Sequence, residues 1–177
     1  ERVKVMRLHG IDREAWNRYT KQDARWYYDV VEPGFKYNLT DLAASIGRIQ
    51  LKKAQQFLKQ SEEIALAYMK AFRELDYLQL PSQAPGHSWH LFLLRIIPEK
   101  LSITRDEFII KMRQAGIGTS VHFIPLHIMS YYKKQYGYKS CDFPVALNNY
   151  SRSISIPIYP GLTSSQVNKI ISTIKKI

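Results

Sequence analysis

Residues 87–177 alternate between segments with the pattern of β-strands and segments with the pattern of amphipathic helices, and this alternation restricts the fold severely. HSWHLFLLRII (87–97) and SISIPI (153–158) are largely apolar and contain many β-branched or aromatic residues, as buried strands do. TSVHF (119–123) has the length and pattern of a shorter strand. Because helices that separate strands must share one core with them, the predicted fold class is a layered α/β or α+β domain.

Two capping boxes mark the beginnings of helices in this region. Thr104 is followed by Glu107 and Thr163 by Gln166, and in each pair the two side chains can satisfy free amides of the first helical turn. Each box leads into an apolar face that is typical of a helix packed on a core. The positions expected to be buried on these two helices are Phe108, Ile109, Met112, Val167, Ile170, Ile171 and Ile174. Shorter helices are predicted within 125–136 and 144–150.

The first 75 residues are organised differently. ERVKVMRL (1–8) has the pattern of the end of a helix, which the following glycine terminates. Residues 11–33 are rich in Trp and Tyr and have no regular pattern, which indicates a long loop of the kind that is often functional. From GFKYNLTDLAASIGRIQL (34–51) as far as Leu75, apolar residues recur at helical spacing. This stretch predicts either one long bent helix or two consecutive helices, beginning near Asn38 or Thr40.

The composition favours an anionic partner inside a reducing compartment. Lys and Arg number 26 against 15 Asp and Glu, so the formal net charge is +11, which suits phosphorylated small molecules or nucleic acid. The basic residues are scattered and form no nucleic-acid-binding arm. The single cysteine, Cys141, excludes an internal disulfide, and we interpret it as a packing residue. No apolar run approaches the roughly 20 residues of a membrane span, so we expect a cytoplasmic protein without a membrane partner.

The candidate functional residues each allow two interpretations from physical chemistry alone. Lys36 is either a solvated surface residue or a phosphate ligand beside a helix N-terminus, where free amides favour an anion. His122, at the end of a predicted strand, either faces a ligand or is a buried, hydrogen-bonded histidine. His122 and His127 do not have the spacing of helical zinc ligands, so no metal is predicted. A Walker loop, a Rossmann fingerprint, a CxxC pair and a GxSxG elbow are all missing from the sequence.

Four motifs occur in the order and at the intervals that characterise one enzyme family. They are GFKYNLTDLAASIGRIQL (34–51), WHLFLLRI (89–96), GIGTSVHFIPLH (116–127) followed by a Tyr pair, and SISIPIYPGLT (153–163). With these motifs the chain resembles the C-terminal half of the DegT/DnrJ/StrS-type sugar aminotransferases. The resemblance implies the aspartate aminotransferase (type I) fold and pyridoxal 5′-phosphate (PLP) as cofactor. It also implies amino transfer from an amino acid, usually glutamate, to a nucleotide-linked 4-keto pentose or hexose for polysaccharide or lipopolysaccharide biosynthesis.

The same resemblance implies that the large cofactor-binding domain is missing from this sequence. In the family, the lysine that binds PLP covalently lies upstream of the segment that begins here at Glu1. No catalytic residue is therefore expected in the chain, which by itself is predicted to be inactive. Residues 1–39 would comprise the end of a large-domain helix, the aromatic loop and the GFKYN turn, and residues 40–177 the connecting helices and the small domain. Alone, such a half should expose apolar surface and self-associate; the expected partner is a second copy, as a homodimer, or a chain with the large domain.

The site residues follow from the resemblance position by position. Many relatives have asparagine and arginine where this chain has Lys36 and Asn38, and the asparagine reaches the PLP phosphate of the neighbouring subunit. Because lysine suits a phosphate as a point charge, Lys36 and Asn38 are the predicted cofactor-binding residues. The resemblance places His122 in the sugar-nucleotide pocket. Further substrate-binding candidates are His127, Tyr131, Tyr37 and Trp26.

Two other functions remain open. The chain could be a non-catalytic fragment or regulatory relative that associates with a full-length aminotransferase through residues 34–51. If a Lys-Asn motif is encoded upstream of residue 1, the chain is part of the enzyme itself. If instead a separate chain that carries the PLP-binding lysine co-purifies with it, the interpretation as a non-catalytic relative is favoured. The other alternative, a basic nucleic-acid-binding domain, rests only on the net charge and requires binding that weakens steeply with salt.

Overall fold

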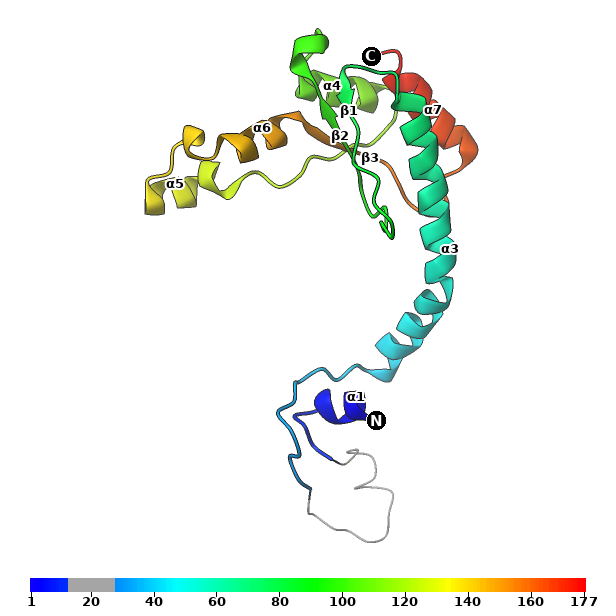
Figure 1. Cartoon of the computed structure of the whole chain (residues 1–177), viewed down its shortest axis with the longest axis vertical. Helices are drawn as coiled ribbons and strands as arrows, with labels where there is room; N and C mark the ends of the chain where they lie inside the picture. The colour runs from blue at the N-terminus through cyan, green and yellow to red at the C-terminus, as the bar shows by residue number, and fades with distance from the viewer. Residues whose placement is uncertain (13–27) are drawn as a thin grey trace. The chain divides into compact units, whose positions relative to one another are not determined.

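The computed structural model describes residues 1–12 and 28–177 (Figure 1). These residues form two compact units, residues 1–53 and residues 54–177, and each unit is described by itself. The predicted division of the chain into residues 1–39 and 40–177 stays a prediction. Within the described part of the chain, no helix is both long enough and apolar enough to cross a membrane.

The first unit contains a short helix, α1 (Arg2–Met6), and the beginning of the long helix α3 (Asp41–Phe72). Thr40 caps α3, since its Oγ1 accepts a hydrogen bond from the amide of Ala43 at 3.3 Å. Of the two arrangements left open by the sequence, the structure has the single long helix, and it begins where the cap was predicted. The second part of α3 belongs to the second unit.

A three-stranded antiparallel sheet organises the second unit. Its strands are β1 (Leu78–Gln79), β2 (Phe92–Ile96) and β3 (Ser153–Ile156), in the order β1-β2-β3. Leu78 lies opposite Ile96 in one pair and Phe92 opposite Ile156 in the other. Alternate residues of β2, namely Phe92, Leu94 and Ile96, are fully buried, as expected of a strand whose one face packs on a core.

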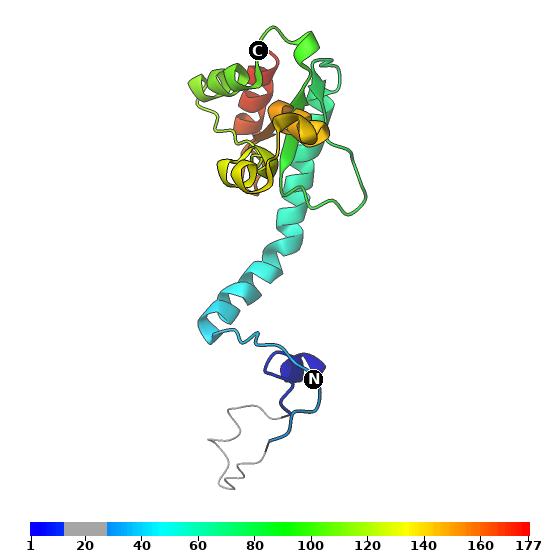
Figure 2. The ribbon, with the colours of Figure 1, turned by 90° about the vertical axis from the view of Figure 1, so that its left-hand side faces the viewer.

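Further helical elements follow α3 along the chain. They are η1 (Pro98–Lys100), α4 (Arg105–Gln114), η2 (Leu126–Ile128), α5 (Ser130–Tyr136), η3 (Ser140–Asp142), α6 (Pro144–Arg152) and α7 (Ser164–Ile174). Both predicted capping boxes are confirmed, Thr104 with Glu107 at the start of α4 and Thr163 with Gln166 at the start of α7. Figures 1 and 2 show α7 beside the C-terminal part of α3.

One hydrophobic core joins the sheet to α3, α4 and α7. Of the positions predicted to be buried, Ile109 and Ile171 are partly covered and the other five are buried. The hydroxyl of Tyr68 on α3 donates to the carbonyl oxygen of Pro157 at 2.9 Å, and burial raises the pKa of this tyrosine, which keeps it a proton donor. The fully buried large side chains are Tyr68, Phe72, Phe92, Phe108, Leu94, Ile96, Met112, Ile154 and Ile174. A mixed α/β small domain of this kind agrees with the predicted fold class.

The predicted strand 119–123 does not form. Only Ser120 pairs, exchanging two backbone hydrogen bonds with Ser155 at 3.1 and 2.7 Å. An antiparallel continuation would place His122 opposite Ser153, but the backbone amide of Ser153, the residue that follows α6, already donates to the carbonyl of Tyr150 in that helix. The pairing therefore ends after one residue, and the side chain of His122 is exposed.

Two other sequence interpretations need correction. Cys141 is exposed and lies beside Asp142, with 3.9 Å between its Sγ and the carboxylate, so it is not a core packing residue. The strand expected over 87–97 is confined to β2, because Trp89 adopts a left-handed backbone (φ 49°) and its amide donates to Nδ1 of His87 at 2.9 Å. This local turn removes the preceding residues from the sheet.

Candidate functional site

The GFKYN turn is held against the end of α1 by backbone hydrogen bonds. The amide of Phe35 donates to the carbonyl of Met6 at 2.7 Å, and the amide of Tyr37 donates to the carbonyl of Arg7 at 2.8 Å. In return, the amide of His9 donates to the carbonyl of Phe35 at 2.9 Å. Leu8 and Lys36 thereby form an isolated antiparallel bridge, so the backbone of the turn has a defined position relative to α1.

Two glycines permit this close approach. Gly10 has φ +74°, and a Cβ there would overlap the carbonyl oxygen of Glu32. A Cβ on Gly34 would overlap the backbone nitrogen of Gly10. The absence of a side chain at both positions is therefore a steric requirement of the turn. Arg2 adds an ion pair with Glu32 at 3.4 Å.

The side chains of the turn point outward from this rigid backbone. Lys36 and Asn38 are exposed, and no described residue forms a hydrogen bond or an ion pair with the Lys36 ammonium. Tyr37 is 70% exposed and stacks on Phe35, with ring centroids 5.1 Å apart and planes 10° from parallel. An uncommitted ammonium and amide on a fixed backbone have the donor chemistry that a phosphate requires.

The two histidines predicted to bind substrate have different environments. His122 is exposed in the segment that lacks the predicted strand. His127 lies in η2, is only 6% exposed, and packs against Phe143 with ring centroids 4.9 Å apart. Its Nε2 is buried and forms no hydrogen bond with a described residue. His127 is therefore a buried side chain with one nitrogen unsatisfied, whereas His122 is open to a ligand.

Tyr131 belongs to a chain of aromatic contacts along α5 and η3. It is 67% exposed and meets Tyr132 edge to face at 5.3 Å. The contacts continue through Tyr136 and Tyr138 and end at Phe143, which also contacts His127. His127 and Tyr131 are therefore connected through one aromatic cluster, which the sequence did not predict. Trp26 lies outside the described residues.

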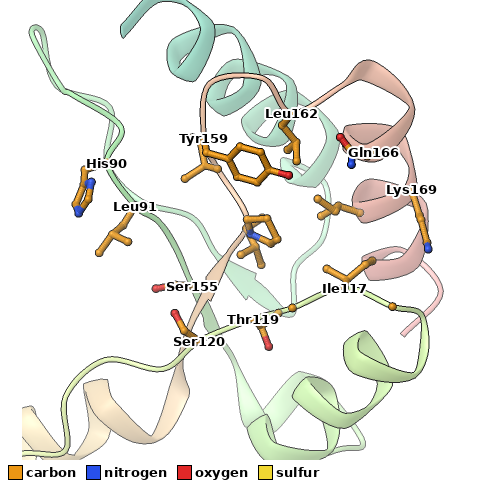
Figure 3. Close-up of a pocket in the computed structure, with 16 residues that line it drawn as sticks. His90, Leu91, Ile117, Thr119, Ser120, Ser155, Tyr159, Leu162, Gln166 and Lys169 are labelled. Carbon is orange, nitrogen blue, oxygen red and sulfur yellow. The ribbon is translucent and has the colours of Figure 1, made fainter. Parts of the chain in front are cut away.

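A pocket in the second unit was not predicted from the sequence. It has a volume of about 650 Å³ and lies between the segment after α4, the C-terminal end of β3, and α7. Figure 3 shows Gln166 and Lys169 of α7 on one side and Ser120 and Ser155 on another. Its walls come from segments that are distant in the sequence, so no local pattern could have revealed it. None of the predicted site residues lines it.

The described residues contain no candidate metal centre: across 1–12 and 28–177, no group of three or more His, Cys, Asp or Glu side chains is placed to hold an ion. The donors available at the GFKYN turn and at the pocket are instead ammonium, amide and hydroxyl groups. These groups bind anions and polar organic molecules.

Sequence comparison gives matches along almost the whole chain. The profile of the DegT/DnrJ/EryC1/StrS aminotransferase family matches residues 1–175. An uncharacterized protein of Methanocaldococcus jannaschii is 48% identical over 179 aligned residues, which cover 100% of this chain and 46% of that protein. The spore coat polysaccharide biosynthesis protein SpsC of Bacillus subtilis is 42% identical, again over 100% of this chain and 46% of the relative. The chain thus spans about half the length of these relatives.

Comparison with solved structures likewise gives matches that cover nearly all of this chain and less than half of the matched protein. A protein of Streptococcus pneumoniae described as a sugar aminotransferase, solved in its PMP form, is 27% identical with a TM-score of 0.73, covering 98% of this chain and 43% of that one. The same protein has also been solved in a PLP form. The aminotransferase PseC of Helicobacter pylori, at 22% identity, shares the fold with a TM-score of 0.73 over 98% of this chain and 44% of its own.

Proposed function

This chain belongs to the DegT/DnrJ/EryC1/StrS aminotransferase family. We propose that it forms part of an enzyme that transfers an amino group from an amino acid to a nucleotide-linked keto-sugar. Glutamate is the amino donor that we propose. The observation that carries the proposal is the family match over residues 1–175. The similarity to a spore coat polysaccharide biosynthesis protein supports a product destined for a polysaccharide. We propose a homodimer, or a complex with a chain that contains the large domain, as the working assembly.

The cofactor of this family is PLP, and the GFKYN turn fits its phosphate. When bound, PLP supplies the electron sink for amino transfer. We assign Lys36 to the phosphate as a flexible point charge and Asn38 as a neutral amide donor beside it. The exposure of both side chains and the fixed backbone between them support this assignment. The contact would be made to the cofactor of the neighbouring subunit.

We assign substrate contacts to exposed groups of the second unit and to the aromatic ring of the turn. His122 can donate to or accept from a sugar hydroxyl, since its ring is open to solvent. Tyr131 and Tyr37 offer exposed rings that can stack on a sugar or a base. We assign His127 to the same substrate region, where its contact with Phe143 would position the aromatic cluster around Tyr131 and its buried Nε2 has no partner among the described residues.

The test uses the complete protein that contains residues 1–177, purified with PLP. Addition of glutamate should convert bound PLP to pyridoxamine phosphate, and the change in the absorbance spectrum of the cofactor measures this conversion. Subsequent addition of a UDP-linked 4-keto-hexose or 4-keto-pentose should regenerate PLP and yield an amino sugar, identified by mass spectrometry. The proposal is wrong if neither glutamate nor another common amino acid converts the cofactor. Conversion of the cofactor without an amino-sugar product from any UDP- or dTDP-linked keto-sugar would contradict the substrate class alone.

A further inference from the structure

We propose that the pocket between the segment after α4, the end of β3, and α7 binds a small organic anion with an apolar body. The pocket lies wholly within the second unit and none of the groups assigned above to PLP or to substrate lines it. Its volume of about 650 Å³ falls in the range of pockets that hold small molecules. The proposal therefore adds a binding site to the function proposed above and does not depend on that function.

The charge of the pocket favours an anion. Lys169 is its one lysine, and neither an aspartate nor a glutamate is among the residues that line it. The Lys169 ammonium lies near the glycine turn that ends α4, since a Cβ on Gly116 would be 3.5 Å from its Nζ. No described residue forms an ion pair with Lys169. The positive charge is therefore available to a ligand at the rim of the pocket.

Neutral donors lie on two sides of the pocket. The Oε1 of Gln166 accepts from the amide and the hydroxyl of Thr163 at 2.9 and 3.0 Å, which leaves its NH₂ group without an acceptor among the described residues. Ser155 is 5% exposed, and its Oγ forms no hydrogen bond with a described residue. A buried hydroxyl without a partner is unfavourable, so an acceptor atom of a molecule bound beside Ser155 would relieve that cost.

Much of the remaining wall is apolar, which explains why a bare anion should bind less well. Leu91, Ile117 and Leu162 line the pocket together with Ile156, Pro157, Ile158 and Ile170. A ligand that fills this volume must bury apolar atoms against these side chains, and each buried methylene group adds to affinity. Carboxylates and phosphate monoesters that carry an alkyl or aryl body have both features.

The experiment is isothermal titration calorimetry on the complete protein that contains this chain, loaded with PLP. The probes are hexyl phosphate and hexanoate, which distinguish a phosphate from a carboxylate, with hexanol and inorganic phosphate as controls. At least one of the two anions should bind with one site per chain. Hexanol, without the charge, and inorganic phosphate, without the apolar body, should each bind about tenfold more weakly or worse. Binding by neither anion, or equal binding of hexanol, would overturn the proposal.

Substitutions inside and outside the pocket show where on the protein the anion binds. Lys169→Gln should lower the affinity for the anion by about fivefold, because it removes a charge-assisted hydrogen bond. Ser155→Ala should lower that affinity by about threefold, because it removes a hydrogen bond from a neutral hydroxyl. Lys176→Gln, which removes the same charge just after α7 and outside the pocket lining, should leave the affinity unchanged. Lys36→Gln should also leave it unchanged. If Lys36→Gln weakens binding and Lys169→Gln does not, the anion binds at the GFKYN turn and the pocket proposal is wrong.

Discussion

At the scale of single residues, β3 contains two buried serines with opposite hydrogen-bonding states. The Oγ of Ser153 donates to the carbonyl of Asn149 at 2.6 Å, whereas the Oγ of Ser155 has no partner among the described residues. Ser153→Ala should therefore lower the free energy of unfolding by about 1–2 kcal/mol. Ser155→Ala removes a hydroxyl that is unsatisfied in the absence of ligand, so it should leave that free energy within about 0.5 kcal/mol or raise it.

Urea unfolding followed by circular dichroism measures this pair directly. Each variant removes one oxygen atom from a serine of the same strand, so each is the matched control of the other. A loss of stability in Ser155→Ala equal to that in Ser153→Ala would mean that the Ser155 hydroxyl has a partner in solution. That result would also weaken the proposed role of Ser155 in ligand binding.

Lys36 is the residue on which the assignment of cofactor binding depends. Lys36→Gln in the complete protein should lower the affinity for PLP by about tenfold, because a charge-assisted hydrogen bond to the phosphate is replaced by a neutral one. Lys36→Arg should retain most of the affinity, since the charge stays. Fluorescence titration of the apoprotein with PLP measures both.

The control for Lys36 is Lys70→Gln, an equal change of charge at the end of α3. Equal affinity of Lys36→Gln and the unaltered protein for PLP would remove Lys36 from the cofactor site. Because the Lys36 side chain contacts no described residue through a hydrogen bond or an ion pair, its loss should not change thermal stability. A defect in folding therefore cannot account for weaker PLP binding.

At the scale of elements, the two capping boxes differ in whether they titrate. In α4 the Oε2 of Glu107 accepts from the amide of Thr104 at 2.7 Å, and this backbone hydrogen bond, followed by one from the Thr104 hydroxyl, lowers the pKa of Glu107 below its ordinary value of 4.5. A carboxylate whose pKa is lowered by folding stabilises the native state above pH 4.5, and this contribution disappears as the pH falls through the lowered pKa. In α7 the corresponding residue is Gln166, which cannot titrate.

Glu107→Gln should consequently make the two boxes alike. The amide oxygen keeps the acceptor, so part of the cap survives at pH 6, but the stability lost between pH 6 and about pH 3 should be smaller than in the unaltered chain. Urea unfolding at both pH values tests this difference. Glu99→Gln, in η1, is the control for the loss of one carboxylate at the surface. An unchanged pH dependence in Glu107→Gln would contradict the prediction.

The elements also indicate what sequence can and cannot predict here. Capping boxes depend on residues three apart, and so the starts of α4 and α7 were predicted correctly. Strand pairing depends on distant segments: β1 was not predicted, and 119–123 was predicted as a strand although only Ser120 finds a partner. The pocket has the same origin, since its walls come from the residues just before β2, the segment after α4, the end of β3 with the residues that follow it, and α7.

For the site residues, the sequence identified which side chains could bind a ligand, but it did not indicate whether each one is buried or exposed. The turn at Lys36 and Asn38 was identified through a family resemblance, and its fixed backbone depends on contacts with residues 6–10 that no pattern revealed. His122 and His127 belong to one motif, yet one is exposed and the other is buried against Phe143. Burial of this kind is decided by an aromatic cluster in the tertiary structure, and the motif cannot report it.

At the scale of the whole molecule, the chain presents apolar surface beyond its core. In the first unit, Leu42, Ile46 and Ile49 of α3 are 75%, 57% and 49% exposed. Their spacing places them on one face of the helix. A shallow depression beside Ile46 and Ile49 includes Ser45 and Gln50. A contiguous apolar face of this kind usually marks a surface that another protein covers.

The isolated chain of residues 1–177 should therefore self-associate, and sedimentation velocity over a range of concentrations should detect the dimer or larger species. The net charge of +11 opposes association, so higher salt should strengthen it by screening. Ile46→Gln should shift the chain toward monomer, because it places an amide in the middle of the apolar face. Ile110→Gln is the matched control, since Ile110 of α4 is similarly exposed at 52% but lies outside that face. A chain that stays monomeric at every concentration, or one that Ile110→Gln dissociates as readily as Ile46→Gln does, would show that the α3 face does not drive association.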